Sequence, residues 1–245
     1  MRETLHMKEV DNRDVVAVER LRILAEYQRR EREICSDFYA PWEPAEMLSR
    51  ANRKRVAATL LHRSGVFPTV GDSCLEIGIG TLGWLGELIS WGVHETDIHG
   101  IDLQASRVER AREILPGSDL QNGDASALPW ADNSFHLVIA STVVSSILQQ
   151  DVRRLVAGEI TRVLMPGGAL LWYDFAFNNP RNPHVRKVDR AELRELFPNL
   201  LGPIRTVTLA PPLARLVAPR SWALAVLLET IPFLRTHLLA VLKKT

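Results

Sequence analysis

Four residues in the first third of the chain combine a carboxylate with closely spaced glycines. Glu76 precedes Gly78, Gly80 and Gly83, and the G-x-G-x-x-G spacing is typical of a tight turn between a strand and a helix. Gly78 and Gly80 permit the sharp turn and let a ligand approach bare backbone. Residues 74–77 form a short apolar run interrupted only by Glu76, which predicts a buried parallel strand before the turn.

The charge of Glu76 indicates which class of ligand the glycine turn could bind. A nicotinamide or flavin dinucleotide places its pyrophosphate at a helix N-terminus, where the helix dipole favours anions. A carboxylate two residues before the first glycine would repel that pyrophosphate and would suit a cationic ligand. S-adenosylmethionine (SAM) carries a sulfonium and an ammonium group and meets this requirement. Taken alone, the motif also fits a dinucleotide site or a strand–turn–helix that binds nothing.

Two further acids follow predicted strands. Asp102 lies 24 positions after Gly78 near the end of a predicted strand over 97–103, a place suited to binding ribose hydroxyls. Asp124 follows Gly123 after a short third strand. Because ligands of open parallel sheets gather at the carboxyl ends of the strands, we expect these acids to share one site with the glycine turn.

Strands and helices alternate through the rest of the chain. Besides the strands already named, strands are predicted over 135–140, 169–175, 204–209 and 236–242. Helices are predicted over 81–91, 105–114, 151–164 and 190–196. This alternation indicates a doubly wound α/β sheet with helices on both faces, and the last two strands should pair at one edge.

One apolar segment, residues 221–242, needs to be weighed as a membrane span. It contains Glu229, Pro232, Arg235 and His237, whereas a spanning helix needs about 20 mostly apolar residues without central charges. We therefore predict a buried helix followed by a buried strand.

The N-terminal part is helical and charged. Helices are predicted over 14–34 and 45–64, joined by an aromatic turn over 38–42 that suits either a packed corner or a lid over a ligand. Four basic residues of the second helix are expected to face water: Arg50, Arg53, Lys54 and Arg55.

Composition excludes several classes of protein. The chain has 245 residues and a formal net charge of +1, so no whole-molecule field attracts nucleic acid. Cys35 and Cys74 lie far apart and outside any C-x-x-C, so we expect no disulfide framework and no zinc or other metal site. Residues 1–14 are polar and show no secretory signal, which favours a cytoplasmic location.

These motifs together resemble class I SAM-dependent methyltransferases, particularly the broad type 11 group that methylates small molecules. The resemblance is firm over residues 72–174. It implies a Rossmann-like, mostly parallel sheet of seven strands whose last strand is antiparallel. The resemblance hardly covers the N-terminal helices. Since no shift in composition marks a boundary, we predict a single domain over 1–245, with a helical cap or lid over 1–66 and the core over 67–245.

The resemblance implies a role for eight residues in binding SAM. Glu76, Gly78 and Gly80 would lie beside the methionine part, and Ser141 would meet the methionine ammonium through its backbone. Asp102 would bind the ribose hydroxyls, with Leu103 beside the adenine. The adenine edge would be read by the remaining pair, Asp124 and Ala125.

Differences from related families limit the classes of methyl acceptor that fit this sequence. Residues 141–144 read Ser-Thr-Val-Val where enzymes that methylate the amino groups of adenine or glutamine carry a D/N-P-P-Y box. Neither cysteine lies where cytosine-C5 enzymes keep their nucleophile. We therefore expect a small-molecule acceptor, a sugar or a secondary metabolite, with O-methylation favoured; a nucleic-acid methyltransferase and a non-catalytic SAM-binding protein are the alternatives.

Methyl transfer asks little of the protein beyond orientation, because the sulfonium already activates the methyl group. A base is needed only if the acceptor is a neutral hydroxyl or loses a proton. Three residues are candidates: Tyr173 and Asp174 at the end of the fifth core strand, and His184 in the loop after it. Adjacent strand residues face opposite ways, so we expect one of Tyr173 and Asp174 to face the site and the other to pack.

Overall fold

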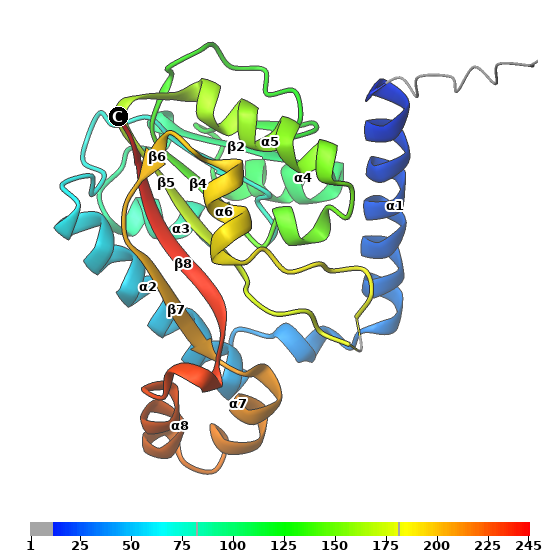
Figure 1. Ribbon diagram of the computed structural model, residues 1–245, viewed down its shortest axis with the longest axis vertical. Coiled ribbons are helices and arrows are strands. Elements are labelled where there is room, and N and C mark those ends of the chain that lie inside the picture. The colour runs from blue at the N-terminus through cyan, green and yellow to red at the C-terminus, as the bar shows by residue number, and fades with distance from the viewer. Residues whose placement is uncertain (1–11, 82, 181) are drawn as a thin grey trace, which may run out of the picture.

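The computed structural model describes residues 12–245 apart from 82 and 181, and describes only the backbone of residues 12, 13, 36 and 37. Most of the polar segment 1–14 and one residue of the predicted helix 81–91 therefore lie outside the described residues. Figure 1 shows one central sheet, with a long N-terminal helix beside it and a pair of short helices beyond its lower end.

The sheet confirms the predicted topology. Its strands are β1 (Cys74–Ile77), β2 (Ile98–Asp102), β3 (Asp119–Asn122), β4 (Phe135–Ser141), β5 (Leu164–Phe175), β6 (Leu200–Leu201), β7 (Ile204–Leu209) and β8 (Arg235–Lys244). The order is β3-β2-β1-β4-β5-β8-β6, with β7 also paired to β8. The first five strands run parallel, and β8 runs antiparallel to its neighbours β5, β6 and β7. Because β6 and β7 pair with opposite ends of β8, the sheet is seven positions wide.

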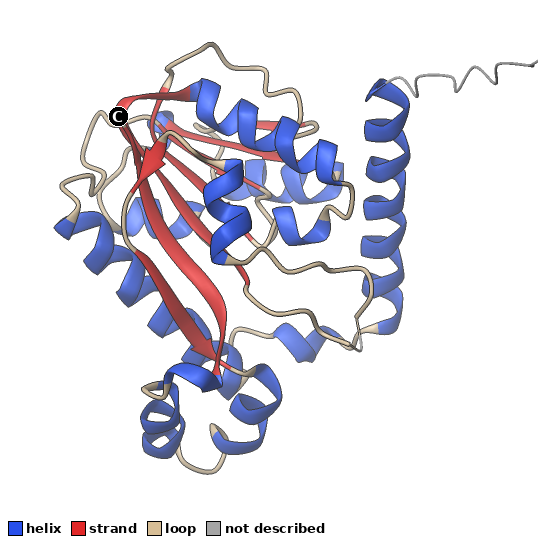
Figure 2. Cartoon of the chain, in the orientation of Figure 1, coloured by secondary structure: helices blue, strands red, loops and turns tan. Residues whose placement is uncertain are grey.

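Helices cover both faces of the sheet, as Figure 2 shows. The α-helices of the described residues are α1 (Asn12–Glu33), α2 (Pro44–Arg63), α3 (Leu85–Ser90), α4 (Ala105–Ile114), α5 (Gln150–Val163), α6 (Arg190–Leu196), α7 (Pro211–Val217) and α8 (Trp222–Glu229). The buried residues of α5 and α6 pack in one core cluster, and those of α3 and α4 in another with the later part of α2. The sheet therefore separates two apolar layers, as expected when every strand is buried on both faces.

Two predicted boundaries are wrong. The helix after the glycine turn begins at Leu85 and not at residue 81, since Thr81, Gly83 and Trp84 lie in turns. The strand β5 begins at Leu164, immediately after α5, so the Met165–Gly168 stretch belongs to the strand. Phe135 of β4 pairs with Leu164 of β5, and the register shifts before Leu137. The pairing of β4 with β5 therefore starts before residue 169, where the strand was predicted to begin.

The prediction for residues 221–242 is confirmed for the buried strand and wrong for the buried helix. The strand β8 is buried, but α8 buries only Ala225 and Glu229 and exposes most of its apolar side chains. The reason lies in the topology, because α7 and α8 project beyond the end of the sheet (Figure 1). Among the described residues no helix combines the length and the apolar character needed to cross a membrane.

Candidate active site

A cavity of about 590 Å³ opens at the carboxyl ends of β1, β2, β4 and β5. Its walls come from these strand ends, from α1 and α2 and from the first residues of α7. All eight residues that the resemblance implied for cofactor binding line it, namely Glu76, Gly78, Gly80, Asp102, Leu103, Asp124, Ala125 and Ser141. The parallel sheet thus brings together side chains that are up to 65 positions apart in the sequence.

The glycine turn is bound to the end of the neighbouring strand. Gly78 has a φ of 75° and donates its N–H to the carbonyl of Ile101 at 2.8 Å. The N–H of Gly80 donates to Asp102 Oδ2 at 3.1 Å, and the N–H of Gln104 donates to Asp102 Oδ1 at 2.9 Å. These bonds fix the carboxylate of Asp102 at the cavity wall, and its remaining lone pairs can accept hydroxyl donors.

Glu76 is a buried acid beside this turn. Its Oε2 accepts the N–H of Leu85 at 3.0 Å, which joins β1 to the start of α3. Burial raises the pKa of Glu76 well above its usual range, while the backbone of Leu85 and the charge of Arg53 lower it. A cation bound in the cavity would favour the charged form of Glu76, so the site suits a positively charged ligand.

The helix α1 closes one side of the cavity. Glu19 of α1 is 2% exposed and accepts the N–H of Leu148, in the loop after β4. Further along α1, Glu31 Oε1 accepts from Gln104 Nε2 at 3.0 Å. Tyr27 lies between these contacts, with the guanidinium of Arg107 4.7 Å from its ring centroid. The helix is therefore attached at two places, to the loop after β4 and to Gln104 after β2.

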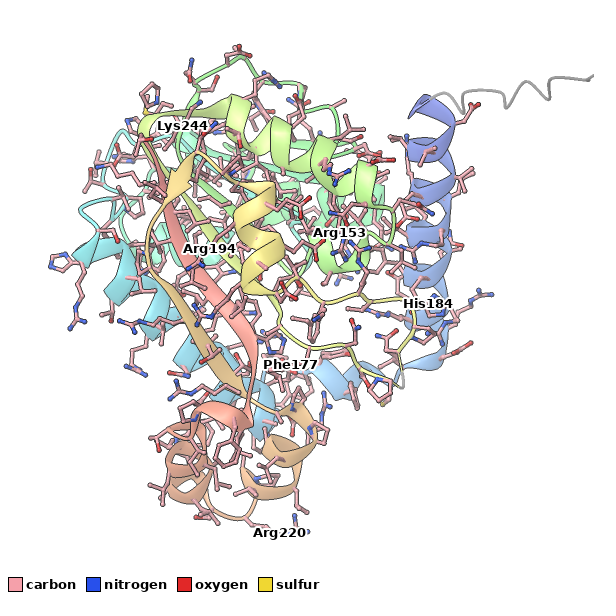
Figure 3. The ribbon with its side chains drawn as sticks, viewed as in Figure 1. Arg153, Phe177, His184, Arg194, Arg220 and Lys244 are labelled. Atoms are coloured by element: carbon pink, nitrogen blue, oxygen red, sulfur yellow. The ribbon has the colours of Figure 1, made fainter. Side chains whose placement is uncertain are left out.

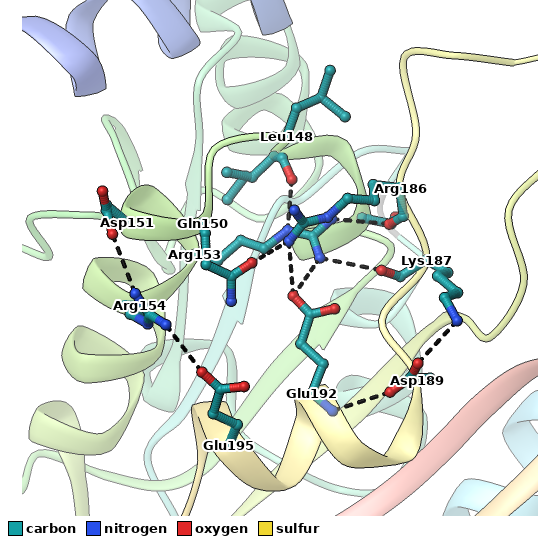
Figure 4. A network of polar contacts seen from close by, with 12 residues as sticks. Leu148, Gln150, Asp151, Arg153, Arg154, Arg186, Lys187, Asp189, Glu192 and Glu195 are labelled. Atoms are coloured by element: carbon teal, nitrogen blue, oxygen red, sulfur yellow. Dashed lines mark hydrogen bonds and ion pairs between the residues drawn. The ribbon is translucent and has the colours of Figure 1, made fainter.

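The loops after β4 and β5 are joined by Arg153, a fully buried residue of α5 (Figure 4). Its Nε donates to the carbonyl of Ile147 at 2.6 Å, and its Nη2 donates to the carbonyl of Arg186 at 2.9 Å. Glu192 balances the charge, with Oε1 2.7 Å from Nη1. Because Ile147 lines the cavity, this network holds part of the cavity wall in place.

Tyr173 and Asp174 face opposite sides of β5. Tyr173 lines the cavity, and its hydroxyl lies 2.9 Å from Thr208 Oγ1. Asp174 lies away from the cavity and is 1% exposed, with Oδ2 accepting the N–H of Ser145 at 2.9 Å. Burial raises the pKa of Asp174 to about 6. Of the two, the structure brings Tyr173 to the site and places Asp174 in the packing beneath the loop after β4.

His184 faces α1 and not the cavity. Its Nε2 lies 3.5 Å from Glu26 Oε2, so the loop after β5 contacts the helix that closes the cavity (Figure 3). Hydrogen bonding from Arg29, followed by Arg30 and the charge of His184, lowers the pKa of Glu26 to about 2. In this position His184 can hold the loop to the helix but does not meet a bound acceptor.

Residues 74–168 match the family model described as a methyltransferase domain. Over these residues the chain is similar to methyltransferase domains, and its sheet has the topology of the class I, Rossmann-like type. The match begins at the first residue of β1 and ends in β5, so it includes all eight residues that the resemblance implied for cofactor binding. Domains of this family use SAM as the methyl donor.

Relatives of the chain carry methyltransferase names. It is 33% identical over 139 residues to the phthiotriol/phenolphthiotriol dimycocerosates methyltransferase of Mycobacterium tuberculosis, covering 56% of this chain and 49% of the relative. It is 29% identical over 161 residues to the phosphatidylethanolamine N-methyltransferase of Cereibacter sphaeroides, covering 63% of this chain and 70% of the relative. The chain thus spans about half the length of the mycobacterial relative.

The fold extends beyond the matched segment. The structure of the 1,6-didemethyltoxoflavin-N1-methyltransferase of Burkholderia thailandensis, with bound 1,6-didemethyltoxoflavin and S-adenosylhomocysteine, matches at a TM-score of 0.63. The alignment covers 100% of this chain and 94% of that chain at 15% sequence identity. The likeness therefore includes the N-terminal helices as well as the methyltransferase domain.

Arg53 lines the cavity, although the sequence predicted that it faces water. Instead of facing water, its guanidinium lies 4.9 Å from the ring centroid of Tyr173 and 5.4 Å from that of Trp84. Its Nε is buried without a hydrogen-bond partner among the described residues. A signal was present, since Arg53 precedes the fully buried Ala57 and Leu61 by four and eight residues and so shares their helix face.

His237 of β8 is the second missed residue. It lines the cavity and stacks on Tyr173, with ring centroids 4.8 Å apart and an interplanar angle of 5°. Burial, followed by the charge of Arg53, lowers the pKa of His237 to about 3. The imidazole is therefore neutral at neutral pH and offers the cavity a hydrogen-bonding group without charge.

The lowered pKa of His237 predicts a loss of stability in acid. The folded state binds the proton less readily than the unfolded state, so this contribution is present above about pH 6.5 and is lost as the pH falls towards 3. In His237→Gln that loss is absent. The difference in unfolding free energy between wild type and variant, measured with urea, should shift by about 1 kcal/mol between pH 6 and pH 5. Parallel pH profiles of the two proteins would contradict the assignment.

Proposed function

We propose that this chain is a SAM-dependent methyltransferase that acts on a largely apolar, lipid-like small molecule. The assignment of SAM as the cofactor rests on the wall of the cavity, where a buried acid, a glycine turn and two strand-end acids follow in the order that SAM requires. The assignment of the acceptor rests on the acceptor end of the same cavity and on the relatives named above.

The residues present fit SAM in charge and in shape. Glu76 provides a buried negative charge for the ammonium, and the buried, unpaired Nε of Arg53 points to a carboxylate as its partner. A side chain at Gly78 would fill the space in front of the turn, since a Cβ there would lie 2.8 Å from Val143 Cγ2. Asp102 accepts the ribose hydroxyls, and Asp124 with Ala125 borders the adenine. SAM supplies an electrophilic methyl group to this site.

The acceptor end of the cavity combines aromatic and apolar side chains with charged ones. It is formed where Tyr173, His237 and Leu209 of the sheet meet Phe38 and the first turn of α7, with Arg53 and Arg215 beside them. Phe38 is held there by Arg215, whose guanidinium lies 3.8 Å from its ring centroid. The aromatic and apolar part of this lining suits an acceptor with a large apolar portion. The names of the two relatives, a dimycocerosate and a phosphatidyl methyltransferase, denote acceptors with fatty acyl chains.

The chemistry that these residues support is orientation and exclusion of water. Burial raises the pKa of Tyr173, so its hydroxyl is neutral. It can hydrogen-bond the methyl acceptor but does not act as a base that removes the acceptor's proton. His237, with its low pKa, likewise accepts a hydrogen bond but holds a proton poorly. Asp174 acts as a positioning residue through Ser145, and His184 through Glu26. The acceptor therefore brings its own reactivity, and the protein aligns it with the methyl group.

The cofactor assignment is tested by calorimetry on Asp102→Ala. The variant loses an acceptor for two ribose hydroxyls, and charge-assisted hydrogen bonds contribute roughly 1.5–3 kcal/mol, so SAM affinity should fall by about ten- to a hundredfold. Wild type should bind SAM and S-adenosylhomocysteine but not NAD. Tight binding of NAD without binding of SAM would reject the proposed function, and an unchanged affinity in folded Asp102→Ala would remove Asp102 from the site.

The acceptor class is tested by turnover. With SAM carrying a labelled methyl group, we expect label to enter the organic phase of a lipid extract and not the aqueous phase of a glycan extract. Label found in nucleic acid, in a manner that weakens steeply with salt, would instead indicate a nucleic-acid methyltransferase. Absence of label from every extract would leave SAM binding without catalysis.

A further inference from the structure

The two short helices beyond the sheet expose an unusual concentration of large apolar side chains. We name this surface the apolar tip, and it consists of Leu216 of α7, Trp222, Leu224, Val226 and Leu227 of α8, and Phe233 in the following 3-10 turn. Leu227 is 61% exposed and Phe233 is 83% exposed. Together these residues make up a third of the large hydrophobic side chains that the described part of the chain exposes. Figures 1 and 2 place both helices at one end of the molecule, beyond the sheet.

The segment that carries the tip contains little negative charge. From residue 206 to residue 234 the sequence contains a single acid, Glu229, which is buried and accepts the N–H of Leu209 at 3.2 Å. Its bases are Arg215, whose Nη2 lies 3.9 Å from Glu46 Oε1 of α2, and Arg220, which Figure 3 shows at the outermost end of the molecule. Within this segment the apolar surface is therefore accompanied by the positive charge of Arg220 and by no exposed carboxylate.

A groove of about 510 Å³ between α2, α8 and β7 continues this pattern. Its apolar side is formed by Trp222 and Val226 of the tip. Its other side carries Arg55, Arg63 and Arg205, all exposed, and its acid is the buried Glu229. Three exposed arginines beside apolar side chains complement a surface in which anionic groups border hydrocarbon.

We propose that the apolar tip and the arginine groove dock this protein on an anionic lipid bilayer. The exposed side chains of α8 would enter the boundary between headgroups and acyl chains, and Arg55, Arg63 and Arg205 would contact the anionic headgroups. The charge argues against a second copy of the chain as the occupant, because two tips would bring like charges together.

The tip is continuous with the cavity through α7. Pro211, Ala214 and Arg215 line the cavity, while Leu216 of the same helix is 58% exposed at the tip. Docking would therefore bring the acceptor end of the cavity next to the bilayer. A lipid acceptor could then enter without crossing water. The docking itself does not depend on methyl transfer, although this second step rests on the proposed function.

Vesicle flotation with the full chain tests the proposal. We expect wild type to partition onto phosphatidylcholine vesicles containing a third phosphatidylglycerol about tenfold more strongly than onto pure phosphatidylcholine. The double variant Leu227→Ser with Phe233→Ser should lose about tenfold in partitioning, because two exposed apolar side chains are removed. Ile114→Ser, which changes an equally exposed residue on α4, is the matched control and should partition as wild type does.

A second variant separates charge from apolar contact. Arg63→Gln with Arg205→Gln should remove most of the preference for phosphatidylglycerol and retain the weaker binding to phosphatidylcholine. SAM affinity, measured by calorimetry, should be unchanged in every one of these variants, so a failed docking prediction and a failed methyltransferase proposal give different results. Equal binding of wild type to both vesicle types would overturn the proposal. So would a dimer, seen by sedimentation without lipid, that Leu227→Ser dissociates.

Discussion

Replacing Gly78 by alanine is expected to lower the affinity for SAM by more than about a hundredfold. The residue has a φ of 75°, a region that costs a side chain roughly 1–2 kcal/mol, and its new Cβ would lie 2.8 Å from Val143 Cγ2. Without SAM, the variant can relieve both the backbone strain and the contact with Val143 by changing the conformation of the turn. Binding SAM then requires that the original turn be restored, so strain and contact together oppose binding by about 3 kcal/mol.

Gly158→Ala is the matched control for this prediction. Gly158 lies within α5, and a Cβ there would meet no atom within 4 Å. Alanine stabilises a helix interior by up to about 1 kcal/mol relative to glycine, so this variant should unfold at slightly higher urea and bind SAM like wild type. Calorimetry on both variants gives the comparison. Equal SAM affinities in the two proteins would show that the turn at Gly78 does not hold the cofactor.

That the eight residues proposed for the cofactor meet in one cavity was predictable because their signals are local. Each of them lies in a strand of the parallel sheet or within three residues after one, and a parallel sheet brings such ends to one edge whatever the lengths of the connections. Asp102 and Asp124 are 22 positions apart in the sequence and still line one cavity. The strand period was enough to predict that only one of Tyr173 and Asp174 faces the cavity, although not which one.

The acceptor side depends on contacts between distant segments, which local patterns do not specify. In the sequence, Arg53 is one of several basic residues on a charged helix. Only the packing of α2 beside Tyr173 places its side chain at the cavity. His237 reaches the cavity because β8 inserts beside β5 in antiparallel register, with Phe175 opposite His237. The exposure of α8 was missed because an apolar composition was taken to mean burial, whereas exposure depends on whether the sheet extends beneath the helix.

Arg53→Met is expected to lower the affinity for SAM by about a hundredfold and to leave the affinity for 5′-methylthioadenosine unchanged. The second ligand keeps the adenosine and the sulfur but lacks the amino-acid part. Methionine preserves the apolar contact with Trp84 and Tyr173 but removes the guanidinium, whose charge-assisted bonds to a carboxylate contribute roughly 1.5–3 kcal/mol. The loss also withdraws the positive charge that lowers the pKa of Glu76, which weakens the site for the ammonium.

The two ligands make the outcome decisive when both are measured by calorimetry. If Arg53 holds the carboxylate of SAM, only the larger ligand loses affinity, and Arg53→Lys recovers part of it because the charge returns without the planar fork. Equal losses for both ligands would mean that Arg53 only supports the shape of the cavity. If neither affinity changes but turnover falls, the buried guanidinium acts on the acceptor, and the acceptor must carry an anionic group within reach of Tyr173 and His237.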